Sequence, residues 1–295
     1  GGTNNLILSG AFTLNGNDGV TAGSITSRTI QVTNAGLTTI SGVISDDSLD
    51  YGFNKTGAGV LALSAAETYT GPTTVGGGAL LVNGSLASSG VTVTSGALGG
   101  SGTISGAVTV QSGGALAPGN QGIGTLTINN TLSFQTGSTN SVEVSKTAGQ
   151  SDLVTGLTSV SYAGTLLATN LAGTLSVGDS FTIFNASAHS GNFDAVAGSP
   201  GAGLAWSFDP TNGVLSVITG VSMNPTNITF SVSSGNLVLS WPADHIGWEL
   251  QTQTNSLATG LSTNWTTVSG STSVDQMTLP IDPANGAVFF RLIYP

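Results

Sequence analysis

The sequence predicts an all-β protein, a β-solenoid followed by a small antiparallel β-sandwich. One observation is the alternation of apolar and polar residues at a period of two, as in Thr125–Ile128 and Ser141–Val144, which is typical of strands. A second is a composition of 44 glycines, 39% hydrophobic residues and only 6% charged residues, which differs from that of a disordered chain. The third is a short segment that recurs at nearly constant spacing.

The recurring segment predicts the solenoid. Its valine and its Gly-Ala-Leu core return with a period of about 18 residues, which fits one coil of a β-solenoid. Equivalent positions of stacked coils lie about 4.8 Å apart, so equal side chains form rows along the axis. The three copies are residues 73–84, 91–102 and 108–119. The predicted inward rows are Val75, Val93 and Val110, and Leu80, Leu98 and Leu116.

A family resemblance begins just before the first copy. The stretches KTGAGVLALS (55–64), TYTGPTTV (68–75) and GALLV (78–82) resemble the autotransporter-associated β-strand repeat, K-T-G-x-G-x-L-x-L-S, T-Y-x-G-x-T-x-V and G-x-L-x-V. Pro72, where glycine is usual, and Ala66-Glu67, where the loop usually carries an asparagine, depart from the pattern. The resemblance implies a right-handed parallel β-helix in an exported bacterial protein, located extracellularly or at the cell surface. It does not imply an enzyme.

The composition shifts near residue 220, where the sequence around Met223 and Pro225 is typical of a linker. We therefore expect the solenoid over residues 1–220, clearest at 53–119, and a sandwich over 221–295. The motif LVLSWP (237–242) followed by WELQ (248–251) is similar to strands B and C of fibronectin-III or immunoglobulin-like sandwiches. Because such sandwiches have about seven strands, six alternating segments predict a module that is short by one strand. The six segments are residues 228–232, 236–241, 247–251, 264–268, 276–279 and 287–294.

The charge balance limits the partners. The chain has 14 acidic and 4 basic residues, so it lacks the basic patch that nucleic acid requires. No apolar run approaches the ~18 residues of a membrane helix, and we expect no membrane insertion. With no cysteine, disulfides and thiolate metal sites are excluded. We expect no cofactor.

Few residues are candidates for chemistry. Asp46, Asp47 and Asp50 supply oxygen ligands for a calcium ion, although their spacing is not that of an EF-hand, and a solvated turn is the favoured interpretation. Neither histidine, His189 or His245, lies in a nucleophile motif. The scarcity of basic residues along the solenoid predicts that the protein has no catalytic residues and is not an enzyme.

Trp248 and Trp265 are candidate glycan contacts on the sandwich. The alternative is that these aromatic side chains fill the core of a short module, which is the favoured interpretation.

The sequence thus predicts a structural subunit of a filament, sheath or surface layer, joined to copies of itself by β-strand addition. The predicted donor is an uncharged, alternating segment with Leu6, Ile7, Leu8, Phe12 and Leu14. Two alternatives remain open at this point: a surface adhesin that binds cell-surface polysaccharide through the sandwich, and a processed autotransporter passenger.

Overall fold

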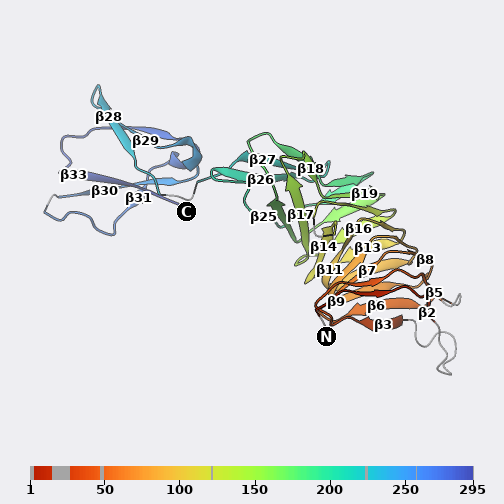
Figure 1. The fold of residues 1–295 in the computed structure, drawn as a ribbon. Helices are drawn as coiled ribbons and strands as arrows, with labels where there is room; N and C mark the ends of the chain where they lie inside the picture. The colour runs from red at the N-terminus through yellow and green to blue at the C-terminus, as the bar shows by residue number, and fades with distance from the viewer. Residues whose placement is uncertain are drawn as a thin grey trace. The chain divides into compact units, whose positions relative to one another are not determined.

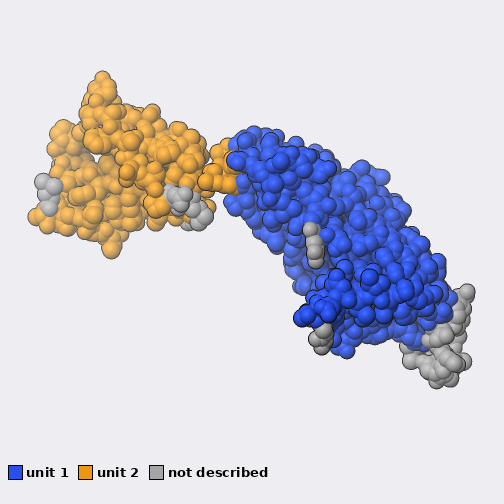
Figure 2. All heavy atoms as spheres, in the orientation of Figure 1, with its two compact units in different colours: residues 1–200, 206–218 blue, residues 201–205, 219–295 orange. Residues whose placement is uncertain are grey.

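The computed structural model describes residues 3–14, 27–46, 50–120, 122–222, 225–256 and 258–294. It divides into two compact units, shown in Figure 2. The solenoid unit is Gly1–Pro200 with Trp206–Ile218, and the sandwich unit is Gly201–Ala205 with Thr219–Pro295. In the described ranges, the helical elements are two 3-10 turns, Ala243–His245 and Ser271–Ser273. The predicted all-β class is confirmed.

The solenoid unit is a parallel β-helix with three ladders of strands (Figure 1). In each ladder a strand pairs in parallel with the equivalent strand of the next coil. The first ladder contains β3 (Ser27–Gln31), β6 (Gly52–Thr56), the first halves of β9 (Thr73–Val82) and β11 (Gly90–Gly100), β13 (Ala107–Val110), β16 (Thr131–Phe134), β20 (Ser159–Tyr162) and β24 (His189–Gly191).

The second and third ladders use the remaining sides of each coil. The second contains β1 (Leu6–Leu8), β4 (Thr38–Ile40), β7 (Val60–Leu63), the second halves of β9 and β11, β14 (Gly114–Pro118), β17 (Thr139–Ser145), β21 (Thr165–Asn170) and β25 (Ala195–Ala197). The third contains the pair β2 (Phe12–Leu14) and β5 (Ile44–Asp46), then β8 (Ala66–Glu67), β10 (Ser85–Leu86), β12 (Thr103–Ile104), β15 (Thr125–Ile128), β19 (Leu153–Leu157) and β23 (Phe184–Ala186). The short strand β18 (Gln150–Ser151) pairs antiparallel with β17.

The inward rows follow the predicted register. Val93 pairs with Val75 and Val110, and Leu98 pairs with Leu80 and Leu116. All six side chains are fully buried, which confirms both predicted rows. A coil therefore buries its apolar side chains against the coils before and after it, and no coil has a core of its own.

Two stacked glycines make the corner between the ladders. Gly78 and Gly96 have φ values of 60° and 76°, in the left-handed region that glycine adopts without steric cost. A Cβ atom on Gly96 would lie 2.3 Å from the carbonyl oxygen of Gly78. The close approach of consecutive coils thus explains why the repeat carries glycine here.

An aromatic cluster fills the interior at the last coils. Phe134, Tyr162, Phe184, Phe193 and Phe208 pack with ring centroids 4.9 to 6.2 Å apart. These larger rings take the place of the valines and leucines of earlier coils, since Phe134 stands in register with Val110. A three-stranded sheet contains β22 (Ser180–Thr182), β27 (Val214–Thr219) and β26 (Leu204–Asp209), and β22 pairs antiparallel with β27.

The sandwich unit has two antiparallel three-stranded sheets among the described residues. One contains β28 (Thr229–Ser233), β29 (Asn236–Ser240) and β32 (Gln276–Pro280). The other contains β31 (Thr266–Thr267), β30 (Glu249–Asn255) and β33 (Ala287–Ile293). Each of the six segments predicted to be a strand overlaps one of these six strands. The buried core is small and consists of Leu239, Trp241 and Leu250.

Candidate functional site

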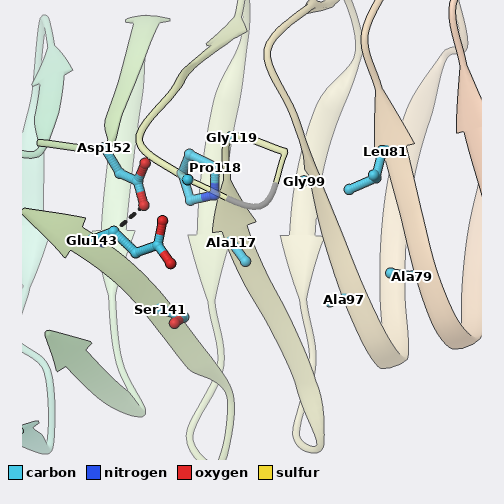
Figure 3. A pocket seen from close by; sticks show the side chains of 11 residues that line it. Ala79, Leu81, Ala97, Gly99, Ala117, Pro118, Gly119, Ser141, Glu143 and Asp152 are labelled. Atoms are coloured by element: carbon cyan, nitrogen blue, oxygen red, sulfur yellow. Dashed lines mark hydrogen bonds between the residues drawn. The ribbon is translucent and has the colours of Figure 1, made fainter. Parts of the chain in front are cut away.

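A shallow hollow of about 240 Å³ lies on the outer surface of the second ladder (Figure 3). Its floor is made of small side chains from consecutive coils, Ala79, Ala97, Ala117 and Ser141. These positions alternate with the inward leucine row, so they face outward. The hollow exists because most of these outward positions carry alanine, glycine or serine, while the larger Leu81 also lines it.

Two carboxyl groups, those of Glu143 and Asp152, stand at one end of the hollow. Asp152 is buried, and its two carboxylate oxygens accept backbone hydrogen bonds of 2.8 Å from Gly124 and Glu143. Burial raises the pKa of Asp152 to about 6, while these two hydrogen bonds oppose the shift. The side chain thereby fastens the segment at Gly124 to β17.

The contacts of Asp152 indicate a structural role for this side chain. Hydrolysis of a glycosidic bond needs a carboxylic acid and a second carboxylate that both reach the substrate. Both oxygens of Asp152 are held by the backbone, and the side chains that line this hollow include no histidine, lysine or arginine. We assign Asp152 to the fold.

The predicted calcium ligands lie partly outside the described residues. Asp47 is not among them, whereas Asp46 and Asp50 meet at Thr70, whose hydroxyl lies 3.0 Å from Asp46 Oδ2 and 2.6 Å from Asp50 Oδ1. The backbone N–H of Thr70 also donates to Asp46. In the described part of the chain, no cluster of three or more acidic or histidine side chains has the arrangement of a metal site.

The two tryptophans predicted as glycan contacts have different surroundings. Trp248 is only 7% exposed, its indole N–H donates to Ser222 O at 2.8 Å, and its ring packs against His245 and Tyr294. Burial among these partners leaves Trp248 little surface for a glycan, which favours the alternative interpretation that this side chain fills the module. Trp265 is half-buried and carries the Arg291 guanidinium 4.3 Å from its ring centroid.

The predicted assembly segment forms the first described strands of the solenoid. Leu6–Leu8 pairs with β4, and Phe12–Leu14 pairs with β5. Leu6 and Ile7 are 47% and 67% exposed, whereas Leu14 is buried. The segment is therefore paired with strands of its own chain.

Sequence reasoning missed two charged side chains that lie inside the solenoid. Lys55 is fully buried, and its ammonium donates to the carbonyl oxygens of Thr56, Gly57 and Gly77 at 2.8 to 3.2 Å. Burial lowers its pKa. Glu67 stands in register with the buried Leu86 and accepts a hydrogen bond from Ile44 N, and burial raises its pKa. Lys55 is the lysine of the K-T-G motif, and this motif was the sequence signal that could have indicated its structural role.

His189 lies at the edge of the aromatic cluster. Its Nδ1 atom is 2.8 Å from the Tyr162 hydroxyl, and burial raises the pKa of that hydroxyl. No serine or cysteine nucleophile is hydrogen-bonded to this histidine among the described contacts. His245 is buried beside Asp244, with which its Nδ1 interacts at 2.7 Å.

Comparison with known proteins identifies the repeat. Residues 53–82 match the model of the passenger-associated-transport-repeat family, which confirms the predicted autotransporter-associated repeat. The chain is 38% identical over 103 residues to an extracellular serine protease of Serratia marcescens. It is also 38% identical over 82 residues to the adhesin BmaC autotransporter of Brucella suis biovar 1 (strain 1330).

These similarities are partial. The matched stretches cover 35% and 28% of this chain, but only 10% of the protease and 2% of the adhesin. The matches support a secreted or cell-surface bacterial protein that carries a passenger-type repeat. Within the described residues, no helix has the length and hydrophobicity to span a membrane.

Proposed function

We propose that this chain is a non-catalytic structural part of a secreted or cell-surface bacterial protein, and that it assembles with copies of itself by β-strand addition. The observation that carries the proposal is the parallel pairing along the solenoid, in which the strands of each described coil add to the strand edges of the coil before it. An unpaired edge offers a row of N–H and C=O groups to a further strand.

The surface of the solenoid supports a structural role. Its repeats carry alanine, glycine and serine outward along the hollow, and the carboxylate of Asp152 is engaged in holding the backbone. Head-to-tail contacts between unlike surfaces do not close, so repeated addition gives a fibre.

Sedimentation velocity and negative-stain electron microscopy of the purified 295-residue chain test the proposal. We expect elongated species whose mass rises with protein concentration. Monomers of constant sedimentation coefficient across a hundred-fold concentration range would contradict self-assembly.

A second candidate function is glycan binding by the sandwich unit, as in an adhesin. Two observations favour it: one similar protein is named an adhesin, and Trp265 presents a half-buried ring beside Arg291. A glycan array probed with the chain and with Trp265→Ala separates the two functions. Binding that the substitution abolishes supports the adhesin, and binding that survives it excludes Trp265 as the contact.

A further inference from the structure

Three asparagine–glycine pairs lie in the described part of the chain, and the fold surrounds them differently. In such a pair the glycine nitrogen can attack the side-chain carbonyl carbon of the asparagine, since glycine has no Cβ atom that restricts the backbone or shields the nitrogen. The pairs are Asn83–Gly84, Asn212–Gly213 and Asn285–Gly286. A fourth pair, residues 15–16, lies outside the described residues.

The first pair is held by both neighbouring coils. The backbone N–H groups of Asn83 and Gly84 donate to Leu63 O at 2.8 and 3.1 Å. The Oδ1 atom of Asn83 accepts a hydrogen bond of 3.3 Å from Ser101 N. A Cβ atom on Gly84 would lie 1.9 Å from Ala65 O, so the packing of the coils also fixes this backbone. The nitrogen that would have to attack is therefore engaged and cannot rotate toward the side chain.

The second pair lies in the turn between β26 and β27 and is held by Asp209. Gly213 N donates to Asp209 O at 3.0 Å, and Asn212 Nδ2 donates to Asp209 Oδ2 at 2.8 Å. The Oδ1 atom of Asn212 accepts a hydrogen bond of 3.1 Å from Val214 N. Gly213 has a φ value of 73°, and a Cβ atom there would lie 2.4 Å from Phe184 O. Both the side chain and the attacking nitrogen are fixed.

The third pair has none of these restraints. Asn285 and Gly286 are exposed in the connection between β32 and β33, after a turn that Asn285 N closes by donating to Asp282 O at 3.1 Å. Neither the Asn285 side chain nor Gly286 N has a hydrogen-bond partner among the described residues. The nearest atom to a Cβ on Gly286 would be Asn255 O at 3.4 Å, an ordinary contact. The Gly286 nitrogen is thus free to turn toward the Asn285 side chain.

We propose that Asn285 is a site of spontaneous deamidation in the folded protein, whereas the fold protects Asn83 and Asn212. The Gly286 nitrogen forms a bond to Asn285 Cγ, and its proton passes through water to the departing amide nitrogen, which leaves as ammonia. Water then opens the resulting five-membered succinimide ring. Attack of water at Cγ gives aspartate, and attack at the main-chain carbonyl carbon gives isoaspartate.

The modification changes the entry to β33. Asn285 and Asp282 both line a cavity of about 640 Å³ that has residues of both sheets of the sandwich unit in its walls, so either product adds a second carboxylate there. Isoaspartate also lengthens the main chain by one carbon directly before Ala287, which pairs with Asn255. We therefore expect faster hydrogen exchange at this end of β33 in the modified protein.

Peptide mapping of the full chain tests the inference. After incubation in mildly alkaline buffer, mass spectrometry of chymotryptic peptides measures the gain of one mass unit that replacement of ammonia by water produces at each pair. Because the two protected pairs react only after local opening, Asn285 should react at least about ten-fold faster than Asn83 and Asn212. In concentrated urea these restraints are lost, and the three rates should agree within about three-fold.

Gly286→Ala keeps the asparagine and changes only the attacking residue. The added Cβ atom restricts the backbone and shields the nitrogen, so deamidation of Asn285 should slow at least about ten-fold. Since this Cβ meets only ordinary contacts, the variant should fold, and an unchanged far-ultraviolet circular dichroism spectrum verifies this. The matched control is Ala284→Ser, an exposed neighbour on the other side of Asn285, which should react within about two-fold of the unchanged chain.

Three results would overturn the inference. One is equal deamidation of Asn285 in the folded chain and in Gly286→Ala. Another is reaction of Asn83 or Asn212 in the folded chain as fast as that of Asn285. The third is an Asn285 that reacts in urea but not in the folded chain, which would mean that the turn protects it. These measurements do not involve self-assembly, so they leave the proposed function to its own test.

Discussion

The solenoid and sandwich units differ in how they complete their cores. In the solenoid, Leu98 is enclosed by Leu80 and Leu116 of the adjacent coils and is fully buried. In the sandwich, Phe230 lies on the inner face of its sheet and is 74% exposed. The sequence around Leu98 supplies both neighbours that it needs, whereas the described sandwich supplies only part of the surface that Phe230 faces. The difference teaches that burial in the solenoid follows from the repeat, whereas burial in the sandwich depends on which strands cover each face of its two sheets.

Truncation of one apolar side chain in each unit tests this contrast between the two cores. Leu98→Ala should lower the free energy of unfolding by about 4 kcal/mol, because it opens a cavity in a row that cannot collapse between fixed coils. Phe230→Ala removes a larger side chain but should cost less than about 1 kcal/mol, since little of it is buried in a single chain.

Denaturant titrations measure both changes. Far-ultraviolet circular dichroism follows mainly the larger solenoid, and tryptophan fluorescence follows mainly the sandwich, which holds three of the four tryptophans, Trp241, Trp248 and Trp265. Ser95→Ala, at an exposed position of the same strand as Leu98, is the control and should leave stability unchanged. Equal losses for Leu98→Ala and Phe230→Ala would refute the contrast between the two cores.

The dependence of unfolding free energy on pH tests how the solenoid buries Asp152. Burial raises the pKa of Asp152 from 3.8 unfolded to about 6 folded, so the folded state binds its proton more tightly. The stability that this proton provides is fully present below pH 3.8 and is lost as the pH rises through 6. The loss amounts to about 3 kcal/mol by pH 7 at 1.36 kcal/mol per pKa unit.

The difference in unfolding free energy between the chain and Asp152→Asn isolates this contribution from that of the other acids. That difference should shrink as the pH rises from 4 to 7. A difference that is constant over this range would mean that Asp152 keeps an ordinary pKa and is ionised in the fold at pH 4.

Much of the fold could be predicted because the relevant signals are local and repeated. The rows of Val93 and Leu98 follow from a period that the sequence states three times, and each sandwich strand alternates at a period of two. The burial of Trp248 depended instead on Ser222 and Tyr294, which are remote in sequence. Alternation alone cannot tell an aromatic platform from an aromatic core.

The charged interior could not be predicted for a similar reason. Asp152 is buried because Gly124, which is distant in sequence, donates to it from the preceding coil. Glu67 occupies a row that is otherwise apolar, and its partner Ile44 is also in another coil. A hydrophobic pattern assigns both residues to the surface, because it contains no information on which backbone N–H groups of the neighbouring coil lie close to each side chain.

Lys55 gives a smaller expected effect within the solenoid. Lys55→Met keeps the length of the side chain but leaves the carbonyl groups of Thr56, Gly57 and Gly77 without their shared donor. Because the substitution also removes the cost of burying an ammonium, the net loss of unfolding free energy should be about 2 kcal/mol.

The comparison for Lys55→Met is Lys146→Met, which removes an exposed ion pair with Asp179 and should cost clearly less. Thermal unfolding followed by circular dichroism ranks the two variants. If Lys146→Met lowers the unfolding temperature more than Lys55→Met does, the hydrogen bonds of the buried ammonium do not stabilise its coil.

The smallest expected effect concerns the surface of the sandwich. Arg291 lies over the ring of Trp265 and also donates from Nε and Nη2 to Gln251 Oε1 at 3.0 and 2.8 Å. A cation–π contact at a half-buried site contributes about 0.5 to 1 kcal/mol. A double-mutant cycle with Trp265→Leu and Arg291→Met should give a coupling energy of this size, measured by urea unfolding followed by circular dichroism. Additive single effects would mean that the ring does not hold the guanidinium, and Trp265 would then be available to stack against an external ligand such as a sugar.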